Sequence, residues 1–193
     1  MKHHQIRAKF DSKNITVYQA FSPAIADAAL RNGTFVPPFS FQRMTWIKPS
    51  FLWMMERSGY GSKSGQERVL SIEISRAGWE EALANAVLTA PLPGQGSEEW
   101  REALDEAPIR VQWDPERTLR GGKSEQRSIQ VGIARDWSRR YAEEWIQSLT
   151  DITPLVSKMA AKRRLGQWDA AAKLVPAERP YPLPEALRAR LDM

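Results

Sequence analysis

The chain has 193 residues, 42% of them apolar, and a formal net charge of +5 from 28 basic and 23 acidic side chains, which is typical of one domain with a substantial core. Because it contains no cysteine, it cannot form a disulfide framework, a thiol nucleophile or a thiolate metal site. Its two histidines, His3 and His4, lie at the N-terminus, where side chains are usually solvated, which disfavours a Ser-His-Asp triad and a histidine-rich metal centre.

Two strands are predicted near the N-terminus. Apolar and polar residues alternate over Gln5–Phe10 and more regularly over Ile15–Phe21, and the polar turn between them has the length of a hairpin connection. Gln19 interrupts the apolar face of the second strand. A buried amide there needs hydrogen-bond partners, which either neighbouring backbone or a ligand could supply.

A helix follows the second strand. Ser22 and Pro23 are typical of an N-cap and a first helical residue, so a helix is predicted over Ala24–Leu30. Asn32-Gly33 can adopt the positive φ that ends a helix. The proline-containing segment Thr34–Gln42 is predicted to be a rigid loop.

The central stretch of residues 43 to 54, RMTWIKPSFLWM, changes its period within itself. A β-like pattern over Met44–Ile47 is followed by Pro49, which a helix accepts at its first position, and then by apolar residues with helical spacing. Free backbone N–H groups and the positive end of the helix dipole would lie beside Lys48 and Ser50, an arrangement that can bind a phosphate. The apolar residues of this stretch also fit a buried aromatic junction.

The later elements are less regular in their order. They are predicted as a strand over Arg68–Arg76, helices over Gly78–Ala90 and Glu98–Ala107, strands over Ile109–Trp113 and Arg127–Ile133, and helices over 138–149 and Thr153–Leu165. Asp114-Pro115-Glu116-Arg117 is predicted to end its strand in a polar loop that runs to Gln126. Since strands and helices do not alternate, we expect a single α+β domain over 1–175 with mainly antiparallel sheets. A proline-rich tail, 176–193, is expected to lie on the surface or contact a partner.

Charge and hydropathy indicate the class of partner. No apolar run is long enough to span a bilayer, and the N-terminus lacks the apolar region of a signal peptide, so we expect a cytoplasmic protein without a membrane partner. A basic, aromatic-rich surface suits an anionic ligand such as a dinucleotide or RNA. A modest positive charge would also serve solubility alone.

Several motifs together resemble an uncharacterised family of bacterial and fungal proteins, a domain of unknown function. The segments that carry the resemblance are Ile6-Arg7-Ala8, Val17-Tyr18-Gln19-Ala20, Arg43–Leu52, Gln112–Arg117 and Arg127-Ser128-Ile129-Gln130. The resemblance covers roughly residues 5 to 157, the length class of one domain, and it implies no established activity.

A second, more distant resemblance concerns the fold. Strand Ile15–Phe21, its helix, the extended Thr45-Trp46, the next helix and strand Arg68–Arg76 are similar to the opening of ADP-ribosyltransferase domains, including the RNA 2′-phosphotransferases. This implies a split sheet flanked by helices. In those families the first strand carries a His or Arg that holds the dinucleotide, a later strand supplies aromatic or hydroxyl contacts, and a last strand often supplies a Glu. The corresponding positions here are Gln19, Thr45-Trp46, and one of Glu125, Gln126 and Gln130.

The resemblance implies an NAD-dependent transferase that acts on a nucleic acid or another anionic acceptor. The implied catalytic residues are Gln19, Trp46, Glu125 and Gln130, and the implied dinucleotide-binding residues are Tyr18, Ala20, Arg43, Thr45, Lys48 and Ser50. Cleavage of a nicotinamide–ribose bond passes through a cation-like sugar and needs no metal, cysteine or histidine, which suits this composition. One alternative is a non-catalytic RNA- or nucleotide-binding protein whose exposed tryptophans stack on bases. Another is a protein-interaction domain that uses the proline-rich tail. The oligomeric state is not indicated.

Overall fold

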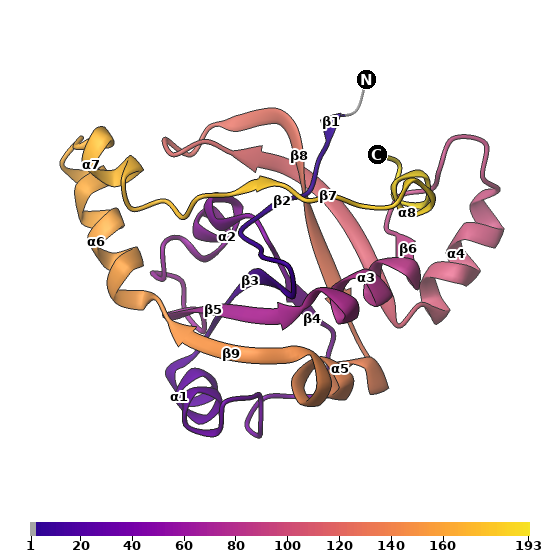
Figure 1. The fold of residues 1–193 in the computed structure, drawn as a ribbon, viewed down its shortest axis with the longest axis horizontal. Helices are drawn as coiled ribbons and strands as arrows, with labels where there is room; N and C mark the ends of the chain where they lie inside the picture. Colours follow the sequence, from indigo (N-terminus) through magenta and orange to yellow (C-terminus); the bar gives the residue numbers. More distant parts are fainter. Residues whose placement is uncertain (1–2) are drawn as a thin grey trace.

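Two β-sheets meet at their edges in the centre of the computed structural model, which describes residues 3–193 (Figure 1). The larger sheet contains β1 (His3–His4), β4 (Thr45–Ile47), β6 (Ala86–Leu88), β7 (Ile109–Arg117) and β8 (Lys123–Ile133). Strand β8 is its centre, because β7 pairs with one of its edges, while β1 and β4 pair with different halves of the other. The smaller sheet has the order β3 (Asn14–Phe21), β5 (Arg68–Ser75), β9 (Ile146–Asp151). A bridge between Tyr18 of β3 and Lys48, just after β4, joins the two sheets.

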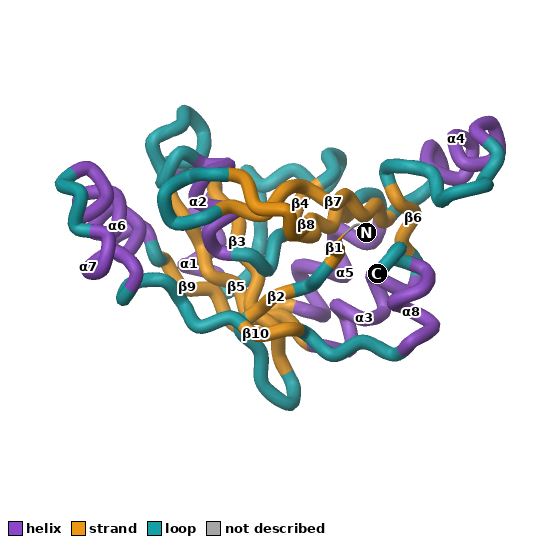
Figure 2. Tube along the Cα trace, turned by 90° about the horizontal axis from the view of Figure 1, so that it is seen from above, coloured by secondary structure: helices purple, strands orange, loops and turns teal. Residues whose placement is uncertain are grey.

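Helices surround this split arrangement. They are α1 (Pro23–Asn32), α2 (Phe51–Ser58), α3 (Arg76–Ala84), α4 (Ser97–Glu106), α5 (Asp136–Arg140) with the π-helical turn η1 (Tyr141–Trp145), α6 (Thr153–Arg164), α7 (Trp168–Ala172) and α8 (Glu185–Arg190). Figures 1 and 2 both show α6 and α7 at one end of the molecule and α4 at the other. Within residues 3–193, the helices are all too short or too polar to cross a membrane.

The predicted α+β class is confirmed, and the pairing is mainly antiparallel with parallel pairs at β1–β8 and β6–β7. The predicted ends of α1 are also confirmed. Ser22 occupies the N-cap, Pro23 opens the helix, and Gly33 ends it with a φ of 68°, a conformation that glycine adopts without steric cost.

The predicted strand Gln5–Phe10 is corrected. Only β2 (Arg7–Ala8) is a strand in this segment, and it pairs with β10 (Arg179–Pro180) from the other end of the chain. Of the expected hairpin, a single bridge between Phe10 and Ile15 is formed. The hairpin does not extend further because β2 turns away to pair with β10, and the edge of β3 that β5 leaves open contacts Lys48 at Tyr18 instead.

Two predicted helices are too long. Helix α3 ends at Ala84 and is followed by β6, and η1 ends at Trp145 and is followed by β9. Strands β6 and β9 add to the edges of β7 and β5, respectively. Their backbone groups are therefore satisfied by distant strands, an effect that local periodicity cannot reveal.

The predicted strand break at residues 114–117 is also wrong. Strand β7 continues through this segment to Arg117, so the connection to β8 shortens to residues 118–122. Pro115 is accommodated where the register between β7 and β8 shifts, one of the few places in a sheet that tolerate proline. This extension carries Asp114 onto the sheet.

The C-terminal segment 176–193 crosses the molecule from α7 to α8 (Figure 1, yellow). It contributes β10 to the pair with β2, and it buries Tyr181 and Leu191 in the main core. The Tyr181 hydroxyl accepts a hydrogen bond from Arg76 Nε at 2.8 Å and donates one to Glu80 at 2.6 Å. A second, smaller core packs α2, α6 and α7 against Tyr18.

Candidate functional site

A cleft of about 650 Å³ opens where β3, β4, β7 and β8 come together beside α2. Six residues singled out from the sequence line it: Gln19, Ala20, Thr45, Trp46, Lys48 and Gln130. Also at its walls are Phe21, Met44, Trp53, Met54, Arg57, Gln66, Gln112 and Asp114. Its volume lies within the range of small-molecule and cofactor sites.

Gln19 connects the two sheets behind the cleft. Its Nε2 donates to Thr45 Oγ1 at 2.7 Å and to the Trp46 carbonyl at 3.1 Å, and its Oε1 accepts from the Tyr141 hydroxyl at 2.8 Å. Both amide hydrogens are therefore engaged, and Gln19 is 3% exposed. The predicted backbone partner is present as the Trp46 carbonyl, and two side-chain hydroxyls that were not predicted complete the set. Gln19 therefore holds β4 in place.

Trp46 reaches the cleft because Gly132 lies beneath it. The two residues are partners in the β4–β8 register, and a Cβ at Gly132 would lie 3.0 Å from the Trp46 ring and 2.6 Å from Met44 Sδ. No side chain fits in this space. The bare backbone of β8 thus leaves room for the indole of Trp46 at the cleft wall.

Lys48 is a nearly buried cation at the cleft, with 6% of its surface exposed. Its Nζ donates to the Trp46 carbonyl at 3.2 Å and lies 5.2 Å from the ring centre of Trp53. Burial, reinforced by the positive charge of Arg57 and partly offset by Asp114, lowers the pKa of the amine to about 7. A negatively charged ligand in the cleft would reverse this effect, because it would stabilise the protonated amine.

Asp114 is a carboxylate held by two amides. Gln112 Nε2 donates to its Oδ1 at 2.9 Å, and Gln130 Nε2 donates to its Oδ2 at 2.7 Å. Gln112 and Gln130 are directly paired across β7 and β8, so all three side chains share one face of the sheet. Among the described residues that line the cleft, Asp114 is the one carboxylate.

The remaining predicted residues lie elsewhere. Tyr18 is buried against Phe51 in the smaller core, and Ser50 is buried, with its Oγ accepting from the Trp53 N–H. Arg43 and Glu125 are exposed and do not line the cleft. Glu125 precedes Gln130 by five residues on β8, which is roughly 17 Å along a strand.

The predicted phosphate position at the start of α2 is occupied by the chain itself. The helix begins at Phe51 with Ser50 as its N-cap, and not at Pro49 as predicted, and the Phe51 N–H donates at 2.7 Å to Glu178 of the C-terminal segment. Burial raises the pKa of the Glu178 carboxyl to about 8, although the bond from Phe51 acts in the opposite direction. The Phe51 N–H is therefore engaged within the protein, and the positive charges that line the cleft are those of Lys48 and Arg57.

Of the eight described cleft-lining residues that were not predicted as site residues, three carry a charge or an indole ring: Trp53, Arg57 and Asp114. Trp53 and Arg57 are spaced four residues apart, which places them on one face of α2, a signal that was present but unused. Asp114 carried no usable signal, because Pro115 beside it indicated a strand end.

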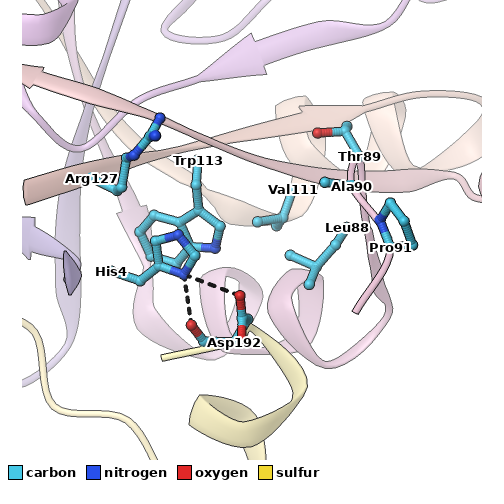
Figure 3. A pocket seen from close by; sticks show the side chains of 9 residues that line it. All are labelled: His4, Leu88, Thr89, Ala90, Pro91, Val111, Trp113, Arg127 and Asp192. Carbon is cyan, nitrogen blue, oxygen red and sulfur yellow. Dashed lines mark hydrogen bonds and ion pairs between the residues drawn. The ribbon is translucent and has the colours of Figure 1, made fainter. Parts of the chain in front are cut away.

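A second cavity, of about 220 Å³, lies on another part of the larger sheet (Figure 3). His4, expected to be solvated, instead stacks on Trp113 with ring centres 4.5 Å apart. Its Nδ1 lies 2.6 Å from the Asp192 carbonyl and 3.7 Å from the Asp192 carboxylate. These contacts hold the two ends of the chain against β7, so His4, Trp113 and Asp192 have a structural role.

The geometry can be compared with known proteins. A family model described as a domain of unknown function (DUF4291) matches residues 5–181. This confirms the resemblance drawn from the motifs, and it extends the match into the C-terminal segment that crosses the molecule. None of the curated proteins matches the chain.

Proposed function

The chain belongs to the DUF4291 family, a domain of unknown function, and from this premise we propose that it is an NAD-dependent transferase of the ADP-ribosyltransferase-like class. Its acceptor is a nucleic acid or another anionic molecule. The observation that carries the proposal is the convergence of Gln19, Thr45-Trp46 and Gln130 on one cleft from three different strands. In the distant resemblance to ADP-ribosyltransferases, Gln19 and Thr45-Trp46 stand at the dinucleotide-binding positions. Gln130 is one of three candidates, with Glu125 and Gln126, for the position on the last strand.

The arrangement of the elements supports the same class. Strand β3, helix α1, strand β4, helix α2 and strand β5 follow one another in the order that the resemblance implies. The sheet is split between β3 and β4, and the cleft lies at the split. Ligands commonly bind at such a discontinuity because side chains from both sheets converge there.

The cleft residues fit a dinucleotide with a cationic nicotinamide ring. Lys48 and Arg57 supply positive charge for the pyrophosphate, and Trp46 offers a flat aromatic wall on which a ring can stack. Thr45 accepts from Gln19, so its own hydroxyl hydrogen can be donated to a ligand. No metal is needed for any of these contacts.

Asp114 is suited to the chemical step. Bound NAD⁺ supplies a ribose whose bond to the charged nicotinamide ring is already weak. The Asp114 carboxylate, fixed by Gln112 and Gln130, can stabilise positive charge that develops on the sugar and accept the proton that the acceptor releases. In this assignment Gln19 and Gln130 are positioning residues, while Asp114 supplies the charge that a Glu usually supplies in this class.

A non-catalytic nucleotide- or RNA-binding protein is the second candidate. Two observations favour it: both amide hydrogens of Gln19 are engaged within the protein, and Gln130, a neutral amide, stands on the strand where the class often carries a Glu. Such a protein would bind the dinucleotide without releasing nicotinamide.

Titration calorimetry and thermal shift with NAD⁺ up to millimolar concentration test binding, and chromatography for nicotinamide tests turnover. Lys48→Met should weaken NAD⁺ binding by roughly ten- to a hundred-fold, because a charge-assisted hydrogen bond contributes about 1.5–3 kcal/mol. Lys13→Met, at an exposed lysine in the turn before β3, is the matched control. Absence of heat and of thermal shift with the wild-type protein would remove the proposal, and binding without nicotinamide release would select the second candidate.

A further inference from the structure

The cleft continues along the surface as a line of hollows. A neighbouring hollow of about 250 Å³ shares Trp53, Arg57 and Asp114 with the cleft and adds Lys63 and Arg117. Lys63 Nζ donates to the Arg57 carbonyl at 2.6 Å, so the loop after α2 is held against the helix. The two hollows are therefore parts of one continuous depression.

A third hollow, of about 340 Å³, lies at α6 and α7 and is lined by residues other than those of the first two. Gly59 belongs to its wall, and a Cβ at Gly59 would lie 3.3 Å from the Lys63 side chain of the second hollow. The turn between β7 and β8 lies against this hollow, because Arg163 Nε donates to the Leu119 carbonyl at 2.9 Å. Figure 1 shows the tip of the β7–β8 hairpin pointing towards the α6–α7 end of the molecule.

Positive charge dominates this line. Among the described residues that line the three hollows, six are cationic, namely Lys48, Arg57, Lys63, Arg117, Arg163 and Arg164, and two are acidic, namely Glu56 and Asp114. We call these six cations the basic tract. Its charges come from the residue after β4, from α2 and the following loop, and from β7 and α6, so they do not belong to a single solvated helix face.

Aromatic rings line the same hollows. The guanidinium of Arg163 lies 4.0 Å from the ring centre of Tyr60, and that of Arg120 lies 5.0 Å from the ring centre of Trp168. Guanidinium groups stacked on rings present planar, cationic surfaces, on which unpaired bases can stack while phosphates pair with the charges. An acidic peptide would use the charges but not these planar surfaces.

We propose that the basic tract binds single-stranded nucleic acid and leads its acceptor group into the cleft. The identification of the bound strand as the acceptor rests on the proposed function, whereas the binding itself does not. A groove lined by charges and flat groups suits a flexible single strand, since a duplex keeps its bases stacked within itself. RNA and DNA share this chemistry.

Fluorescence anisotropy with labelled 15-nucleotide single strands of RNA and of DNA, at 50 to 200 mM salt, tests the inference. Neutralising six phosphates would give a slope of about −4 for log K against log salt concentration, at about −0.7 per phosphate contact. The double variant Lys63→Glu/Arg164→Glu changes two exposed cations of the tract. Its slope should be shallower by about 1.4, and its dissociation constant should rise by about tenfold or more.

The matched control is Arg31→Glu/Arg101→Glu. Both arginines are exposed and lie outside the tract on α1 and α4, and Arg31, like Arg164, is in the last turn of its helix. The two double variants have the same net charge, so the inference requires that the control bind the single strands as the wild type does. Equal losses in both variants would overturn it, as would equally tight binding of a 15-base-pair duplex or of polyglutamate.

The outcome is separable from that of the proposed function. NAD⁺ binding, measured by calorimetry, should be unchanged in Lys63→Glu/Arg164→Glu. If the wild-type protein binds single strands but not NAD⁺, the result supports the basic tract and refutes the transferase. If it binds NAD⁺ but no single strand, the result refutes the basic tract and leaves the transferase supported. Tighter binding of RNA than of DNA, or the opposite, would identify which nucleic acid the tract takes.

Discussion

The substitution Lys48→Met tests whether the buried amine of Lys48 lowers the free energy of unfolding, a cost that binding of a ligand by Lys48 would explain. The pKa of its amine is about 7 in the folded protein, compared with 10.5 for an exposed lysine. At about 1.4 kcal/mol per pH unit, this difference corresponds to roughly 5 kcal/mol of lost folding free energy when the amine is charged. Methionine has a similar length and no charge, and the Trp46 carbonyl keeps its hydrogen bond from Gln19.

The sign of the pH dependence follows from proton binding. Below pH 7 the folded and unfolded states both hold the proton, so the full cost is present. Between pH 7 and 10.5 the unfolded state binds more protons, so the stability of the wild type rises with pH relative to the variant. Above pH 10.5 the cost disappears.

Urea unfolding of both proteins at pH 6.5 and pH 9.5 measures this effect. Lys48→Met should be more stable by about 4–5 kcal/mol at pH 6.5, and the gap should shrink by about 3 kcal/mol, to about 1.4 kcal/mol, at pH 9.5. Lys13→Met, at an exposed position, should change stability by less than about 0.5 kcal/mol at both pH values. A variant that is less stable than the wild type, or a gap that does not narrow at high pH, would refute the reasoning.

Two further predictions concern the fold. Glu178→Gln keeps an oxygen that accepts from the Phe51 N–H but cannot ionise. The pKa of Glu178 is raised from 4.5 to about 8 in the folded protein. As the pH rises from 4.5 to 8, the stability of the wild type should therefore fall relative to the variant, by at most roughly 5 kcal/mol. Urea midpoints at pH 5 and pH 8.5 measure it, and a gap that is the same at both would contradict it. Gly78→Ala would place a Cβ 2.4 Å from the ring of the buried Trp145. We therefore expect the free energy of unfolding to fall by about 1–3 kcal/mol. An unchanged urea midpoint at pH 7 would contradict this and show that Trp145 can move.

Local sequence was sufficient for the elements that carry both their own period and their own ends. Strand β3 and the start of β5 were correctly predicted from alternation, and α1 from its cap, its first proline and its terminal glycine. The six predicted residues that line the cleft came instead from the resemblance to ADP-ribosyltransferases and from the phosphate site predicted in the central stretch. Alternation alone could not have given them, because neighbours such as Gln19 and Ala20 lie on opposite faces of a strand. Their meeting at one cleft required the bridge between Tyr18 and Lys48, which no local pattern encodes.

The remaining features depend on partners that are distant in the sequence. Segment 146–151 has helical spacing of apolar residues, yet it forms β9 because β5 offers an unpaired edge. Glu178 closes the start of α2 across a separation of 127 residues, and Asp114 reaches the cleft because β8 continues the sheet past Pro115. Periodicity identifies the apolar face of a segment, but it does not identify the strand edge that will form hydrogen bonds with the segment's backbone. Strand pairing, and with it the cleft that the paired strands form, is therefore determined by the packing of the whole chain.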